Sequence, residues 1–343
     1  MKLSLDKIRE ITCGAVKVEE TDGVFRFYRF TEEQRETYRR IKPECVDFYN
    51  KCLATAGIKL RFTTDSRTLC LKIFSPEENT GSSRKYFAFD VFVNGEIIDS
   101  LSNFTDSQMT GNYSLTVLGS GNFGKIFDLG QGEKSVCVHF PFSIAPDITE
   151  ISIDDGAFIK PLKRQKKMIC FGDSITHGYD VLHPSAMYTA KLASALSAEE
   201  YNKGIGGDIF FPELAAVRDG FDPDYITVAY GTNDWSGCHR DVTRNRIKGF
   251  FENLRETYPA AKIFAITPIW RAESVEEREY GAFSLIGQDI KEICGDIGGI
   301  TVIDGFNLVP HRPEYFGDLR LHPNDKGFGK YFENLYREIK KHL

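Results

Sequence analysis

The sequence predicts two parts, a β-sandwich of the jelly-roll type followed by an α/β domain built on a parallel sheet. The first part contains many short runs in which apolar residues alternate with polar ones, separated by glycine-rich turns, which is typical of sandwiches. After Pro161 the pattern changes, and strands alternate with helices. The 343 residues are enough for two domains. We therefore expect an accessory domain over residues 1–160 and a second domain over residues 161–343.

The N-terminal part is expected to be almost entirely β. Val24 to Arg29 is a short aromatic run, and Asn94-Gly95 predicts a type I′ hairpin turn. Thr31 to Ile41 is the one expected helix, with Thr31 as its N-cap. The remaining strands are expected at residues 59–63, 68–74, 87–93, 96–101, 115–118, 125–129, 135–140 and 150–153.

The C-terminal part is expected to hold a parallel sheet of about five strands with helices on both faces. Its buried strands are predicted at residues 168–171, 225–230, 262–266 and 300–303, and a short segment ends at Asn202. Helices are predicted at residues 185–197, 212–218, 242–258, 275–294 and 325–341.

Composition excludes several classes of partner. The net charge of −6 gives no general basic field, so we expect neither nucleic acid nor an anionic membrane as a partner. The basic run Lys163 to Lys167 is interpreted as a solvated linker. No apolar run reaches membrane-spanning length and no signal peptide is recognised, which predicts a cytoplasmic location. The eight cysteines lack a C-x-x-C pair, so neither disulfides nor a zinc site is expected.

One buried strand leads directly to a serine. Residues 168–171 run into Gly172-Asp173-Ser174, which alone also fits a simple helix cap. Three more polar segments follow, at residues 202–208, 231–234 and 322–324. Ligands of open α/β sheets bind outside the carboxyl ends of the strands, so we expect all four loops on one edge. Together they could supply the base and the oxyanion donors that a hydrolytic serine needs.

These segments resemble a known set of motifs. GDSIT at Gly172, the N-x-x-x-x-G of Asn202 to Gly207, GTND at Gly231 and HPN at His322 are similar to the four blocks of the SGNH (GDSL) hydrolase superfamily, in the same order. The resemblance covers residues 167–343. It implies a flavodoxin-like, three-layer α/β/α domain with a five-stranded parallel sheet. It also implies ester hydrolysis through an acyl-serine, with no metal and no organic cofactor.

The resemblance assigns roles by position. Ser174 matches the nucleophile, and its backbone N–H matches one oxyanion donor. Gly207 matches the second donor, through its backbone N–H, and Asn233 matches the third, through its side-chain amide. His322 matches the base that accepts the serine proton.

The acid of the triad departs from the pattern. The superfamily usually places it three residues before the histidine, where this chain has Leu319, whereas Asp318 lies four before. Our hypothesis is that the loop bulges at Gly317, so that Asp318 still orients the imidazole and Leu319 and Leu321 turn inward. A Ser-His dyad supported by a backbone carbonyl and a role for Asp304 remain the alternatives.

The two-part layout resembles carbohydrate esterases in which a jelly roll precedes the catalytic domain. We therefore expect removal of a short acyl group, chiefly acetyl, from an oligosaccharide or another small ester. Trp235 and Trp270 follow predicted strands and are candidates for the pocket wall, although ordinary packing explains them equally well. The alternatives are a lipid or aryl esterase, a thioesterase, and a carbohydrate-binding protein with an inactive hydrolase domain.

Overall fold

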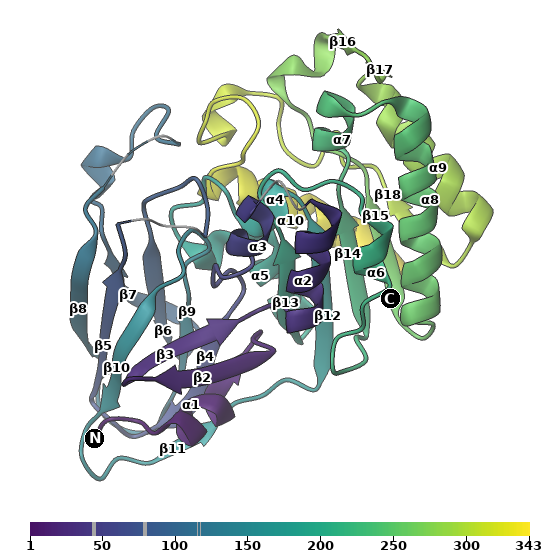
Figure 1. The fold of residues 1–343 in the computed structure, drawn as a ribbon. Helices are drawn as coiled ribbons and strands as arrows, with labels where there is room; N and C mark the ends of the chain where they lie inside the picture. The colour runs from purple at the N-terminus through teal and green to yellow at the C-terminus, as the bar shows by residue number, and fades with distance from the viewer. Residues whose placement is uncertain (43–45, 78–80, 115, 117) are drawn as a thin grey trace.

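The structure is a computed structural model that describes residues 1–42, 46–77, 81–114, 116 and 118–343. Two antiparallel sheets make up most of the N-terminal region, and a parallel sheet lies at the centre of the C-terminal region (Figure 1). The fold is therefore of the mixed α/β class that the sequence predicts.

The N-terminal sheets pack face to face. One has the order β1 (Thr12–Cys13), β4 (Lys59–Thr64), β9 (Lys134–His139), β6 (Ala88–Val93) and β7 (Glu96–Ser102), with β11 (Ile159–Pro161) also paired to β4. The other has the order β2 (Lys17–Thr21), β3 (Val24–Tyr28), β10 (Asp147–Ile153), β5 (Thr68–Ser75) and β8 (Gly121–Asp128). Phe62 and Phe89 of the first sheet share a core with Leu71 and Ile148 of the second, which makes a β-sandwich.

Local signals in this region were informative. The predicted hairpin joins β6 to β7, with φ of 50° at Asn94 and 90° at Gly95, as a type I′ turn requires. The predicted helix is α2 (Glu32–Ile41), and Thr31 closes a capping box with Gln34. The prediction that this helix is alone was wrong, because α1 (Leu5–Ile11) and α3 (Val46–Lys51) are also present. Of the strand expected at 115–118, residues 115 and 117 lie outside the described residues.

The C-terminal sheet has five parallel strands, as predicted. Their order is β13 (Ala198–Gly204), β12 (Lys166–Gly172), β14 (Tyr225–Ala229), β15 (Lys262–Ile266) and β18 (Ile300–Ile303). Counted along the chain this is 2-1-3-4-5, the flavodoxin-like order. One face is covered by α5 (Tyr188–Ala195) and α10 (Asp325–Ile339), and the other by α6 (Pro212–Ala215), α8 (Arg240–Thr257) and α9 (Ser284–Ile297).

One predicted helix begins too early. The sequence placed its start at Val275, whereas α9 begins at Ser284. The intervening chain forms a 3₁₀ turn and the short antiparallel pair β16 (Glu277–Arg278) and β17 (Gly281–Ala282). Val275 is 90% exposed, so its apolar side chain does not belong to a buried helical face.

The N-terminal region covers the edge of the parallel sheet. Every residue of the edge strand β13 is buried. The buried Arg29 guanidinium donates to the carbonyls of Asn202 and Gly204, at 3.1 and 2.7 Å, and Lys203 donates back to the Arg29 carbonyl. An open strand edge is thereby protected by hydrogen bonds and ion pairs from another part of the chain. The division at residues 160 and 161 stays a prediction.

No helix in the described residues has the length and apolar character needed to cross a bilayer. The cytoplasmic location stays a prediction.

Candidate active site

Ser174 lies where the central strand β12 ends. The strand stops at Gly172, and the short helix α4 (Ser174–His177) follows at once. Glycine is required at 172, because a Cβ there would lie 2.1 Å from Thr176 Oγ1 and 2.8 Å from the Ala229 carbonyl oxygen. Asp173 caps the helix by accepting from the Ile175 N–H, and burial raises the pKa of Asp173 to about 6. The turn thus holds the serine in a fixed place.

Ser174, His322 and Asp318 form a continuous chain of hydrogen bonds. Ser174 Oγ lies 2.8 Å from His322 Nε2, and His322 Nδ1 lies 2.7 Å from Asp318 Oδ2. All three come from the same edge of the sheet, since His322 and Asp318 lie on the loop between β18 and α10. The arrangement has the geometry of a nucleophile, a base and an orienting carboxylate.

Asp318 is held as an anion. Burial alone would raise its pKa, but the hydrogen bond and charge of His322 and nearby backbone N–H groups lower the pKa to about 2. Its Oδ1 accepts from the backbone N–H groups of Arg320, Leu321 and His322 at 2.8–3.0 Å. The other oxygen, Oδ2, is therefore directed to the imidazole.

The one-residue offset before the histidine is absorbed at Leu319. This residue has φ of 64° and is 41% exposed, while Leu321 is buried. The prediction that Leu319 turns inward and that Gly317 supplies the bulge was wrong. Gly317 has no positive φ, and glycine is needed there because a Cβ would lie 2.6 Å from Asp180 Cβ. The extra residue turns outward in the left-handed region, which leaves Asp318 in reach of the histidine.

Asp304 takes no part in this chain of hydrogen bonds. Its carboxylate pairs with Lys291 at 2.7 Å and lies at the end of β18, with about half of the side chain exposed. The structure does not bring it to His322, whose Nδ1 is instead bonded to Asp318.

Sequence reasoning missed two residues beside the histidine. Asp180 Oδ2 lies 3.8 Å from His322 Nδ1, and Asp180 is fully buried. Arg84, from the N-terminal region, donates through Nε to Asp180 Oδ1 at 2.5 Å, and its Nη2 lies 3.5 Å from His322 Nδ1. Tyr179 packs its ring against His322 at 5.5 Å. Only the short distance of Asp180 from Ser174 in sequence could have indicated it, and Arg84 carries no local signal.

The two expected oxyanion loops are joined to each other. Gly207, with φ of 89°, follows β13, and Asn233 follows β14 on the short helix α7 (Thr232–Gly237). Asn233 Nδ2 donates to the carbonyl of Asp208 at 2.9 Å. An amide nitrogen has two N–H groups, and this bond uses one. Both loops therefore lie at the carboxyl ends of strands adjacent to β12.

The N-terminal helices α2 and α3 support the Gly207 loop. Tyr38 of α2 donates to Asp208 Oδ2 at 2.7 Å, and Lys51 of α3 donates to the Gly206 carbonyl at 2.8 Å. Phe48 lies 3.6 Å from the position of a Cβ on Gly207. The N-terminal region thus contacts the site from two sides, here and at Arg84.

The two tryptophans lie in different surroundings, and the pocket-wall prediction is wrong for Trp235 and stays a prediction for Trp270. Trp235 is fully buried, with its indole N–H donating to the Gly281 carbonyl and its ring packed on Phe283, so it does not line a pocket. The packing explanation is correct for this residue because the ring fills the core beneath α9. Trp270 is partly exposed and stacks on His311 at 5.5 Å.

Among the described residues, Asp180, Asp318 and His322 form the one cluster of metal-ligating type. Its donor atoms are largely engaged, since Arg84 binds Asp180 and three backbone N–H groups bind Asp318. Only Asp180 Oδ2 has no hydrogen-bond partner. The cluster thus fits carboxylates that orient an imidazole and balance its charge better than a cation site.

The sequence around this site matches a known family. Residues 170–329 match the family model described as the GDSL-like lipase/acylhydrolase family. The C-terminal region carries a GDSL-like lipase/acylhydrolase domain. This match supports an ester hydrolase. By sequence, no curated protein matches the chain.

Three solved structures illustrate the fold around the GDSL-like domain. A salicylyl-acyltransferase, SsfX3, from a tetracycline biosynthetic pathway aligns with a TM-score of 0.77 and 20% identity, over 96% of this chain and 94% of its own. A family two carbohydrate esterase from Cellvibrio japonicus aligns with a TM-score of 0.64 and 15% identity, over 98% of this chain and 96% of its own. Another such esterase, from Clostridium thermocellum and in complex with cellohexaose, aligns with a TM-score of 0.62 and 17% identity, over 84% of this chain and 94% of its own. These likenesses show that the two-part layout recurs.

Proposed function

We propose that the protein removes short acyl groups, chiefly acetyl, from a carbohydrate or a similar small ester. The observation that carries the proposal is the hydrogen-bonded chain from Ser174 through His322 to Asp318. The division into an accessory region, residues 1–160, and a catalytic region, residues 161–343, belongs to the same proposal.

The reaction runs through an acyl-serine. Ser174 Oγ attacks the ester carbonyl while its proton passes to His322 Nε2, and Asp318 stabilises the imidazolium that forms. The tetrahedral oxyanion is bound by the backbone N–H groups of Ser174 and Gly207 and by the Asn233 amide. His322 then donates the proton to the leaving alcohol. In the second half, His322 takes a proton from water, which attacks the acyl-serine and releases the acid.

The substrate class rests on two kinds of support. The turns that carry Ser174 and Asn233 are short, since α4 and α7 begin within three residues of the ends of β12 and β14. The longer connections at residues 267–283 and 304–324 contain 3₁₀ turns and two-residue strands, and no α-helix that could bury a fatty chain. The carbohydrate esterases that share the fold, one of them solved with cellohexaose, favour a sugar as the acyl acceptor. Transfer of the acyl group to an alcohol is a second candidate, because the acyltransferase SsfX3 aligns over both parts of the chain.

A panel of esters tests the proposal. We expect p-nitrophenyl acetate and acetylated xylo- or cello-oligosaccharides to be hydrolysed faster than p-nitrophenyl octanoate. The Ser174→Ala variant should lose activity by roughly 10⁴-fold or more, whereas Ser274→Ala, on a nearby 3₁₀ turn, should not.

The other outcomes are informative in different ways. Faster octanoyl hydrolysis would favour a lipid esterase, and a thioester preference would favour a thioesterase. An added alcohol that captures the acyl group in place of water would favour transfer. Sugar binding without any turnover would favour a binding protein with an inactive hydrolase domain.

A further inference from the structure

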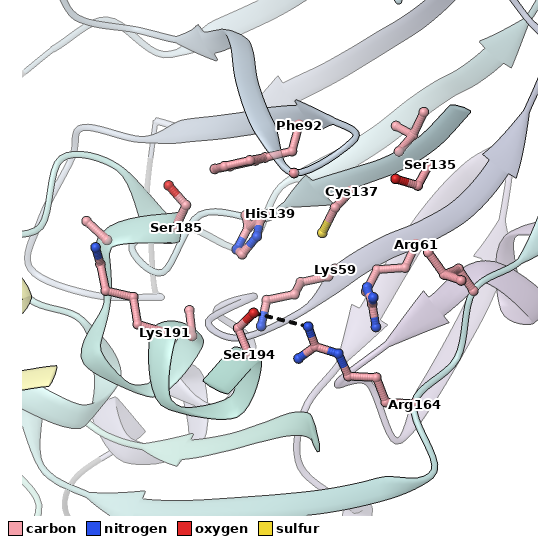
Figure 2. A pocket seen from close by; sticks show the side chains of 15 residues that line it. Lys59, Arg61, Phe92, Ser135, Cys137, His139, Arg164, Ser185, Lys191 and Ser194 are labelled. Carbon is pink, nitrogen blue, oxygen red and sulfur yellow. Dashed lines mark hydrogen bonds between the residues drawn. The ribbon is translucent and has the colours of Figure 1, made fainter. Parts of the chain in front are cut away.

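A cavity that contains none of the candidate catalytic residues lies between the sandwich and helix α5. It has a volume of about 450 Å³. Strands β4, β6 and β9 form one wall, and the segment that enters α5, the helix itself and the chain after β11 form the other (Figure 2). The cavity is thus enclosed by both regions of the chain.

Strand register places the wall residues in two rows. Arg61 of β4 lies opposite Cys137 of β9, which lies opposite Phe92 of β6. In the next row Lys59 lies opposite His139. The alternate residues of β4 and β9, such as Leu60 and Val138, point into the sandwich core. Because side chains alternate between the two faces of a sheet, those of Lys59, Arg61, Cys137 and His139 point away from the sandwich core, toward α5.

Four cationic side chains line this cavity, from Lys59, Arg61, Arg164 and Lys191, and none of the described residues that line it is acidic. Figure 2 shows Lys59 and Arg61 of β4, and Arg164 of the chain between β11 and β12, directed into the same space. Such a concentration of like charge is unfavourable in a partly enclosed site unless an anion balances it.

Only one of these charges has a carboxylate partner. Lys59 Nζ lies 2.6 Å from Glu200 Oε2, which is buried behind it. Within the described part of the chain, Arg61, Arg164 and Lys191 form no ion pair with a carboxylate. Arg164 is fixed in place by bonds to the carbonyls of Ala193 and Ala198 and to Ser194 Oγ.

The electrostatics agree with the geometry. Burial and then the charge of Arg61 lower the pKa of Arg164, so the two guanidinium groups repel one another. Burial and then Lys59 lower the pKa of His139 to about 3, although Asp90 acts in the opposite direction. His139 is therefore neutral at pH 7 and can donate or accept a hydrogen bond. Asp90 itself bonds to His183 and Ser185.

We propose that this cavity binds a small organic phosphate monoester. The two guanidinium groups of Arg61 and Arg164 match the two negative charges of such a group, and arginine binds phosphate oxygens in a bidentate manner. A carboxylate would balance only one of them. The rings of Phe92 and His139, 5.4 Å apart, and the Ser135 and Ser185 hydroxyl groups provide a wall for the rest of the ligand. This site is independent of the proposed ester hydrolysis.

Isothermal titration calorimetry on the full chain tests the proposal. Four probes are used: glucose 6-phosphate, inorganic phosphate, glucuronate and glucose. We expect glucose 6-phosphate to bind most tightly, inorganic phosphate more weakly, glucuronate more weakly still, and glucose not at all. Added salt should weaken the binding.

The variants Arg61→Gln and Lys191→Gln should weaken phosphate binding, with Arg61→Gln losing at least about tenfold. The control Arg218→Gln removes an exposed arginine that pairs with Asp222 and should have no effect. Because neither Arg61 nor Lys191 touches the serine site, ester hydrolysis by folded variants should be unchanged. Equal binding by wild type and Arg61→Gln, no binding of either phosphate, or tighter binding of glucuronate would each overturn the proposal.

Discussion

The carboxylate of Asp180 lies 3.8 Å from Nδ1 of His322, the same nitrogen that Asp318 contacts at 2.7 Å. Two carboxylates therefore face one imidazole, and Arg84 binds the more distant of them. The closer carboxylate is the one that backbone N–H groups hold ionised. In the proposed mechanism Asp318 therefore orients the imidazole, whereas Asp180 and Arg84 balance the charge beside it.

Replacement of Asp318 by Asn should reduce kcat by roughly 10²- to 10⁴-fold, because the amide can no longer hold the Nδ1–H tautomer or stabilise the imidazolium. The control Asp304→Asn removes a carboxylate that pairs with Lys291 and should keep nearly all activity. Steady-state kinetics with an acetyl ester, on variants shown by circular dichroism to be folded, measure both. Equal losses in the two variants would contradict the assignment.

Replacement of Asp180 by Asn leaves the Arg84 charge beside the imidazole without this counter-charge. The imidazolium formed during attack should then be disfavoured, and kcat should fall by roughly tenfold or more. The double variant Asp180→Asn/Arg84→Gln should recover part of that loss. A double-mutant cycle on kcat checks this, and losses that simply multiply would show that the two residues act separately.

A buried carboxyl group predicts a pH-dependent stability. Burial raises the pKa of Asp234 to about 7, and its Oδ2 has no partner among the described residues. The folded state then binds more protons than the unfolded state between pH 4 and pH 7, so this group makes stability fall as pH rises through that window. Asp234→Asn should remove this pH dependence. The difference in the free energy of unfolding between the variant and wild type should therefore change by up to about 1.4 kcal/mol per pH unit.

Urea unfolding of wild type and Asp234→Asn at pH 5, 6, 7 and 8 measures this difference. The variant should gain stability relative to wild type as pH rises from 5 to 7, with little further change above. A difference that is constant across the series would show that Asp234 is ionised in the folded protein throughout.

Lys203, which pairs with Asp219 and also bonds to the N-terminal region, should be the most sensitive point of contact between the two regions. Both side chains are fully buried at 2.7 Å, and Lys203 also donates to Gln34 and to the Arg29 carbonyl. Lys203→Met leaves the Asp219 charge unpaired and should lower the free energy of unfolding by roughly 3–5 kcal/mol. The exposed pair of Lys330 and Glu333 offers a control, since Lys330→Met should change the free energy of unfolding by less than about 1 kcal/mol.

Much of the fold followed from local patterns in the sequence. The bounds of β15 and β18 agree with the predicted residues 262–266 and 300–303, because both strands are largely apolar and β-branched or aromatic. By contrast β13 has the sequence AEEYNKG and runs for seven residues, whereas the sequence predicted only a short segment that ends at Asn202. Two of its charged residues are buried against partners from the N-terminal region, since Glu200 pairs with Lys59 and Lys203 donates to the Arg29 carbonyl. No pattern within the strand itself encodes those partners.

Part of the candidate site could likewise be predicted from the sequence, and part could not. Ser174 and His322 lie within contiguous motifs, and the structure brings their side chains together. The outward turn at Leu319 depends on the packing of Gly317 against Asp180, which a single sequence does not reveal. Arg84 lies nearly a hundred residues before Asp180 and reaches it only through the packing of the two regions.

Peptide mapping after reaction with a p-nitrophenyl phosphonate tests the central claim most directly, because such a reagent is attacked only by an activated nucleophile. The account predicts one covalent adduct, on Ser174, that forms much more slowly in Asp318→Asn and is absent in Ser174→Ala. An adduct on another residue, or ester hydrolysis that persists in Ser174→Ala, would contradict it.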